Sequence, residues 1–105
     1  MQRDNVLSML GIAAKAGKIK SGEFSTEKAV KSGYAYLVVI SGDASENTKK
    51  KFYNMTEFYH VPCYEYKDKE ALGGCIGKQF RVTLAVTDEN LAKAVEDKLK
   101  MIKTE

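Results

Sequence analysis

The stretch from Tyr36 to Ile40 restricts most strongly what this chain can fold into. It is continuously apolar, rich in β-branched residues, and ends at Ser41-Gly42-Asp43. A strand with one solvent-exposed face alternates apolar and polar residues, whereas an unbroken apolar run is typical of a strand that is buried on both faces. The sheet that contains this strand must therefore be covered on each side.

Amphipathic helices can supply that cover. Apolar residues recur with a period near 3.6 in several segments. We expect helices over about 3–16, 23–32, 44–59 and 69–75, and a last one after a cap at Thr87 or Asp88. Either Asp43 or Ser45 can cap the third helix. The expected inner stripes are Thr48, Phe52, Met55 and Tyr59 in the third helix, and Leu91, Val95, Leu99 and Ile102 in the last.

Short strands are expected between these helices, over about 18–21, 61–66 and 81–86. Strands that alternate with amphipathic helices predict an α/β fold with helices on both faces of one sheet. A length of 105 residues predicts a single domain over 1–105. The order of the strands is not readable from the pattern.

Composition excludes several classes of protein. No apolar run approaches the roughly 18 residues that span a bilayer. The first residues lack the apolar stretch of a signal peptide, so a cytoplasmic location is expected. The two cysteines, Cys63 and Cys75, and the single His60 are too few for a disulfide framework or a zinc site. We expect two free thiols in or near the core.

Catalytic motifs are also missing. The segment 17–23 has the glycine spacing of a phosphate-binding loop, but Glu23 stands where that loop needs a lysine. A carboxylate there would repel the terminal phosphates of a nucleotide. A lone histidine supports no catalytic triad. The sequence therefore predicts a protein that is not an enzyme, with no cofactor and no small-molecule substrate.

Positive charge is clustered although the net charge is only +3. One cluster is the run 49–51, and the other surrounds the second helix: Lys15, Lys18, Lys20, Lys28 and Lys31. Clustered lysines either form an ordinary solvated face or mark the binding site of a polyphosphate.

The start of the second helix is the best candidate for an anion site. Residues 21–28 combine free backbone N–H groups at a helix N-terminus with side-chain hydroxyls and Lys28 one turn later. Such N–H groups and the helix dipole attract phosphate. An ordinary capped helix would have the same sequence features.

The chain also resembles a known family along nearly its whole length. The matching residues are Leu10-Gly11-Ile12-Ala13, Lys15-Ala16-Gly17-Lys18, Ser21-Gly22-Glu23, Lys28-Ala29-Val30, Gly33, Ala35, Leu37-Val38-Val39-Ile40, Asp43-Ala44-Ser45, Asn47-Thr48-Lys49-Lys50, Val61-Pro62, Leu72-Gly73, Ile76-Gly77-Lys78 and Val86-Thr87-Asp88. In this order they resemble the bacterial YlxQ-like branch of the ribosomal protein L-seven-Ae/L-thirty-e superfamily.

The resemblance implies a three-layer α/β/α sandwich with a mixed four-stranded sheet. It also implies binding to kink-turn RNA, a bent stem with sheared G·A pairs, with ribosomal RNA as a candidate target and ribosomes or ribonucleoproteins as candidate partners. Carried over by position, the contact segments are 22–28 and 67–72, and Lys28 matches the family's lysine. The expected RNA-binding residues are Lys18, Lys20, Ser21, Gly22, Glu23, Phe24, Ser25, Lys28, Lys31, Lys69 and Leu72.

The chain departs from the family at one point. Phe24 and Ser25 stand where the family has a polar Asn-Glu pair. An aromatic side chain can stack on an unpaired base or anchor a protein partner. The alternative is therefore a protein-interaction module of the same fold that has lost kink-turn recognition.

Overall fold

Strand β2 (Leu37–Ile40) is fully buried at the centre of the structure. Leu37 and Val39 pack into one hydrophobic cluster, and Val38 and Ile40 pack into a second cluster on the opposite face. The computed structural model describes residues 4–103. The prediction of a strand buried on both faces is confirmed.

The sheet has the order β1-β4-β2-β3, with β1 (Ile19–Ser21) and β3 (Cys63–Glu65) at its edges. Strand β4 (Thr83–Val86) runs antiparallel to both β1 and β2, whereas β2 and β3 are parallel. The expected mixed four-stranded sheet is therefore confirmed. Its order places the last strand of the chain near the middle, which local periodicity does not reveal.

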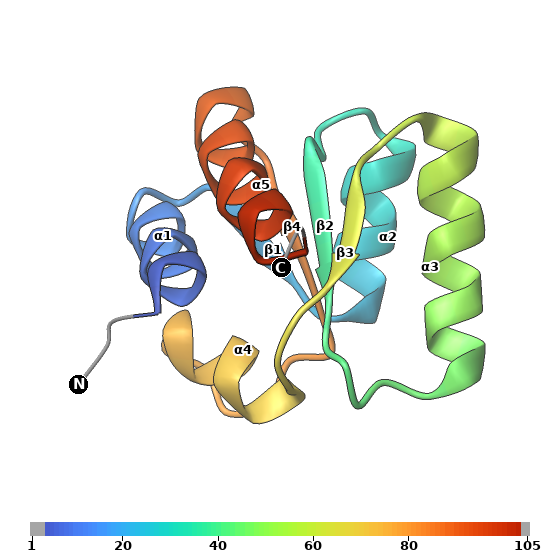
Figure 1. Ribbon diagram of the computed structural model, residues 1–105. Helices are drawn as coiled ribbons and strands as arrows, with labels where there is room; N and C mark the ends of the chain where they lie inside the picture. Colours follow the sequence, from blue (N-terminus) through green and yellow to red (C-terminus); the bar gives the residue numbers. More distant parts are fainter. Residues whose placement is uncertain (1–3, 104–105) are drawn as a thin grey trace.

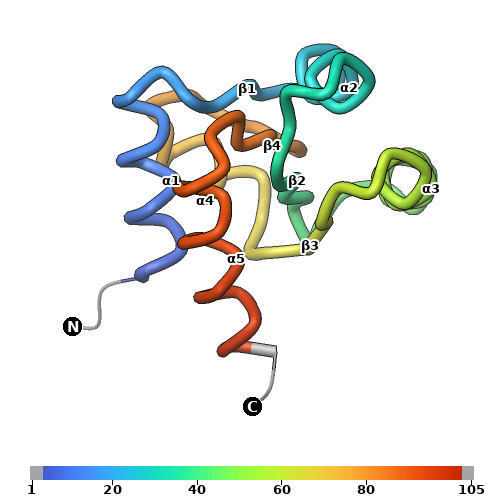
Figure 2. Tube along the Cα trace, turned by 90° about the horizontal axis from the view of Figure 1, so that it is seen from above, coloured from blue at the N-terminus to red at the C-terminus, as the bar shows by residue number. Residues whose placement is uncertain are grey.

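Helices cover both faces of this sheet. Figure 1 shows α1 (Asn5–Lys15), α4 (Lys69–Cys75) and α5 (Glu89–Lys103) on one side, with α2 (Glu23–Lys31) and α3 (Glu46–Tyr59) on the other. The view from above in Figure 2 separates the same layers. The fold is the expected α/β/α sandwich.

Side-chain caps start four of the described helices. Asp4 accepts from the backbone of α1, Ser45 from α3, Asp68 from α4 and Asp88 from α5. Ser45 is therefore the cap of α3, and Asp88 caps α5. Helix α2 differs, because its N-cap residue is Gly22 (φ 90°), which makes no side-chain hydrogen bond to the helix.

The predicted inner stripe of α3 is partly wrong. Phe52 is buried and Met55 is partly buried, but Tyr59 is exposed and Thr56 is buried in its place. Thr56 can enter the core because its Oγ1 donates to the carbonyl of Phe52 at 2.7 Å. Thr48 is only partly buried and takes part in hydrogen bonds at the surface.

The stripe of α5 also ends earlier than expected. Val95 and Leu99 are buried and Leu91 is partly buried, but Ile102 is exposed. It lies in the last turn of the helix, beyond the last buried residue, Leu99.

Both cysteines are free, partly buried thiols that pack against the two hydrophobic clusters, as expected. Burial raises the pKa of Cys63 and of Cys75 to about 11. No three His, Cys, Asp or Glu side chains are grouped as metal ligands within residues 4–103. No helix in this part of the chain is long and apolar enough to cross a membrane.

Candidate nucleic-acid interface

The start of α2 is firmly attached to the sheet. The N–H of Gly22 donates to the carbonyl of Thr83 at 3.0 Å. One turn later, the Thr83 hydroxyl donates to Thr26 Oγ1 at 3.1 Å, and both threonines are fully buried. Because a buried hydroxyl needs a hydrogen-bond partner, this bond fixes the position and the rotation of α2 relative to β4.

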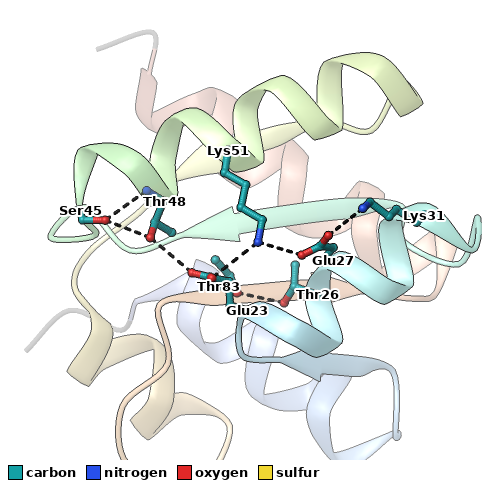
Figure 3. A network of polar contacts seen from close by, with 8 residues as sticks. All are labelled: Glu23, Thr26, Glu27, Lys31, Ser45, Thr48, Lys51 and Thr83. Carbon is teal, nitrogen blue, oxygen red and sulfur yellow. Dashed lines mark hydrogen bonds and ion pairs between the residues drawn. The ribbon is translucent and has the colours of Figure 1, made fainter.

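The first turn of α2 leaves its N–H groups available. Backbone donors in a first helical turn have no intrahelical partner, and no side chain caps them here. The carboxylate of Glu23 could have capped these N–H groups, but residues of α3 bind it instead. Thr48 Oγ1 donates to this carboxylate at 3.4 Å, and Lys51 Nζ lies 3.7 Å from it (Figure 3). The helix start can therefore accept an anion from outside.

Arg81 links the segment 67–72 to Ser21, the residue just before the other segment that the resemblance implies for RNA contact, 22–28. Its backbone N–H donates to the carbonyl of Lys69 at the start of α4, at 3.0 Å. Its guanidinium Nε donates to Ser21 Oγ, at the end of β1, also at 3.0 Å. Sequence reasoning missed Arg81, because no local pattern shows that its partners lie 12 and 60 positions away.

A second set of contacts fixes the loop before α4. The N–H of Gly42 donates to the carbonyl of Lys67 at 2.7 Å, and Asp43 Oδ1 accepts from the N–H of Lys69 at 3.0 Å. The nearby hydroxyl of Ser41, followed by the N–H of Lys69, lowers the pKa of Asp43. The starts of α2 and α4 lie at the same, lower end of the sheet in Figure 1.

The predicted lysines differ in how free their charges are. Lys18, Lys20 and Lys28 are exposed and have no ion pair within the described residues. Lys69 lies over the ring of Phe80, with Nζ 5.9 Å from the centroid. Lys31 is different, since its ammonium donates to Glu27 at 2.7 Å.

Figure 3 shows that Glu27 links α2 to α3. It pairs with Lys31 on its own helix and with Lys51 of α3, whose Nζ lies 2.9 Å from Glu27 Oε1. Hydrogen bonds from these two lysines, Lys31 first, lower the pKa of Glu27 to about 2. Lys31 and Lys51 are thus compensated by a carboxylate, which weakens their attraction for an external anion.

The remaining expected residues fall into two kinds. Phe24 is 80% exposed, and Ser25 beside it is half-buried. Leu72 is fully buried in the cluster beneath α1 and α5, so its side chain supports the surface from below and cannot touch RNA directly.

Comparisons with known proteins identify the family. The ribosomal protein L7Ae/L30e/S12e/Gadd45 family matches residues 4–96. The chain is 40% identical over 84 residues to the RNA-binding protein YlxQ of Bacillus subtilis (strain 168), covering 80% of this chain and 84% of that one. It is 38% identical over 81 residues to the large ribosomal subunit protein eL30 of Yarrowia lipolytica, covering 75% and 73%.

Among solved structures, a protein with unknown function from Bacillus halodurans C superposes with a TM-score of 0.91 at 34% identity, covering 93% of this chain and 99% of that one. The family and the names of the relatives indicate a ribosomal-type protein and not an enzyme. This chain belongs to the ribosomal protein L7Ae/L30e/S12e/Gadd45 family.

Proposed function

We propose that this protein binds structured RNA, with a bent stem of the kink-turn type as its main target, through the start of α2 and the loop before α4. The observation that carries the proposal is the Arg81 bridge, which holds Ser21 and Lys69 on one surface. The major groove of regular A-form RNA is too narrow for side chains, so a protein gains access where the stem bends. The relatives described as RNA-binding and ribosomal support this target.

In this proposal, some groups bind phosphates and position the RNA, and others would contact base edges. Uncapped N–H groups of α2 together with Lys20, Lys28 and Lys69 would neutralise phosphates and set the register. Base edges are read by side-chain donors and acceptors, and Phe24 has neither. We therefore propose a cytoplasmic, ribosome-associated protein whose RNA affinity depends more on charge and shape than on base sequence.

A charge-matched pair of variants tests the interface. Lys28→Ala removes a free lysine of α2, whereas Lys93→Ala removes an exposed lysine of α5, on the opposite face of the sheet. Loss of one charge-assisted contact costs about 1 kcal/mol or more, or roughly fivefold to tenfold in affinity. We expect that loss for Lys28→Ala in titrations with a kink-turn RNA, and almost none for Lys93→Ala. Equal effects of the two variants would contradict the proposed site.

The exposed ring of Phe24 favours a second candidate, a protein-interaction module. An aromatic residue of this kind can anchor a protein partner. In that case the unmodified protein would fail to bind kink-turn RNA, and a ribosomal protein would copurify with it after nuclease treatment and be lost in Phe24→Ala.

A further inference from the structure

A groove runs between the edge strand β1 and the outer face of α2. Its volume is about 560 Å³, and its walls include Lys18, Lys20, Phe24, Ser25, Lys28 and Tyr34. This volume lies within the roughly 300–1,000 Å³ that is typical of ligand pockets. The groove begins at the candidate RNA-binding surface, at Phe24, and continues away from it to the loop that follows α2.

The charge of this groove is uncompensated. Its described lining contains three lysines and no carboxylate, and none of the three has an ion pair within residues 4–103. The acidic residues of α2 point elsewhere, since Glu23 and Glu27 are held by Lys51 of α3 (Figure 3). Phosphates are the complementary ligand for such a surface.

Two aromatic rings line the groove along with the lysines. Phe24 is 80% exposed at the start of α2, and Tyr34 is 68% exposed in the loop that follows the helix. Backbone hydrogen bonds hold the position of Tyr34: its N–H and that of Ala35 both donate to the carbonyl of Ala29, at 3.0 and 3.2 Å. Exposed aromatic faces beside lysines are the usual platform for unpaired bases.

The dimensions favour a single strand over a duplex. From Phe24 to Ser32 the helix advances about 12 Å at 1.5 Å per residue. That distance matches roughly three stacked nucleotides at about 3.4 Å each. Bases inside a regular stem are already stacked on one another, so only unpaired nucleotides can present their faces to Phe24 and Tyr34.

We propose that the groove between β1 and α2 binds about two to three unpaired nucleotides that continue from the stem held at the start of α2. Lys18 neutralises phosphates of this flank, Lys20 and Lys28 bind phosphates where the flank joins the stem, and Tyr34 stacks on a base. This inference rests on the proposed function and extends it, because the preferred RNA is then a bent stem with a single-stranded flank. Base stacking and phosphate contacts then replace the polar contacts to the G·A pairs, for which this chain lacks the family's Asn-Glu pair.

Fluorescence anisotropy with three RNAs tests the proposal: a blunt kink-turn stem, and the same stem with a three-nucleotide extension on the 5′ or the 3′ side. We expect one extension to tighten binding about tenfold, as one base–aromatic stack would. Tyr34→Ala should remove this gain and leave the affinity for the blunt stem unchanged. Tyr36→Ala is the matched control, because Tyr36 is also an exposed tyrosine but lines a different depression, beside α5.

The outcomes separate the two proposals. Failure of the blunt stem to bind overturns the proposed function. If the stem binds but neither extension helps, or if the gain survives in Tyr34→Ala, the groove proposal is overturned and the proposed function stands. A gain that both tyrosine variants abolish would show a general aromatic effect and would also overturn the groove assignment. A 2-aminopurine in the extension should lose fluorescence on binding to the unmodified protein, and should keep it with Tyr34→Ala.

Discussion

At the scale of single residues, Phe24 and Ser25 set this chain apart from the family pattern. They occupy the first turn of α2, whose position is fixed by Gly22 and by the buried pair Thr26 and Thr83. The backbone on which the resemblance implies a base-reading pair is thus in place, while the Asn and Glu side chains of that pair are absent. Recognition at this point should respond to side-chain replacement without any change in the backbone.

The double variant Phe24→Asn with Ser25→Glu tests that expectation on a blunt kink-turn stem. Each restored base contact is worth about 1–3 kcal/mol, so binding should tighten by at least about tenfold. Discrimination against a stem with mutated G·A pairs should increase with it. Calorimetric titration of both proteins with both RNAs measures the effect. Tight and selective binding by the unmodified protein would mean that other residues read the bases.

Glu27 provides a prediction for the stability of the protein as a function of pH. Its pKa is about 2 in the folded state, below the ordinary 4.5, because Lys31 and Lys51 bind its charged form. A depressed folded pKa stabilises the fold above the unfolded value, and this contribution disappears as the pH falls from about 4.5 to about 2. Urea unfolding should therefore show Glu27→Gln less stable than the unmodified protein at pH 7, with the difference shrinking towards pH 2.

The lysine partners supply the control for this experiment. In a Lys31→Ala, Lys51→Ala background, Glu27→Gln should have no pH-dependent effect on the free energy of unfolding. A persistent effect in that background would show that the pH dependence has another origin.

At the scale of elements, α4 depends on one glycine of a neighbouring pair. A Cβ on Gly73 would collide with the carbonyl of Gln79 and come within 2.9 Å of Phe80 N, whereas a Cβ on Gly74 would meet nothing within 4 Å. The segment that Gly73 touches leads directly to Arg81. Close contact between α4 and this segment therefore helps to place Arg81, which bridges Lys69 and Ser21.

The two alanine variants should differ in sign. Gly73→Ala should destabilise the protein by about 1–3 kcal/mol through overpacking against backbone. Gly74→Ala should be neutral or stabilising by up to about 1 kcal/mol, because alanine is the better helix former. Thermal unfolding of both variants measures this difference. Equal destabilisation by the two would contradict the close approach of Gly73 to residues 79–80.

The elements that sequence reasoning predicted are those governed by local chemistry. The buried strand β2 and the caps Ser45 and Asp88 follow from residues close together in the chain. The bridge from Arg81 to Ser21 and the ion pair between Glu27 and Lys51 join distant segments, so no periodicity reveals them. The RNA-binding role of the candidate residues stays a prediction. The structure adds which of their lysines have no ion pair within the described residues.

At the scale of the whole molecule, charge is distributed unevenly around α2. The face of α2 towards α3 holds Glu23 and Glu27, which are paired with lysines (Figure 3). The groove between α2 and β1 instead holds the unpaired Lys18, Lys20 and Lys28. A net charge of +3 therefore understates the local field in the groove. The paired side is electrostatically nearly neutral, so a polyanion should approach from the side of β1.

The dependence of RNA affinity on salt should report the number of free lysines. Each neutralised phosphate contributes a slope of about −0.7 to −0.9 to log K against log salt. If Lys18, Lys20, Lys28 and Lys69 each bind one phosphate, the slope for the extended kink-turn RNA should be about −3. Lys20→Ala should reduce its magnitude by about one, because one fewer counterion is released.

Lys93→Ala should leave the slope unchanged, since its charge lies on the opposite face of the sheet. Titrations at several salt concentrations measure all three slopes, and a flat dependence would show that charge does not drive binding.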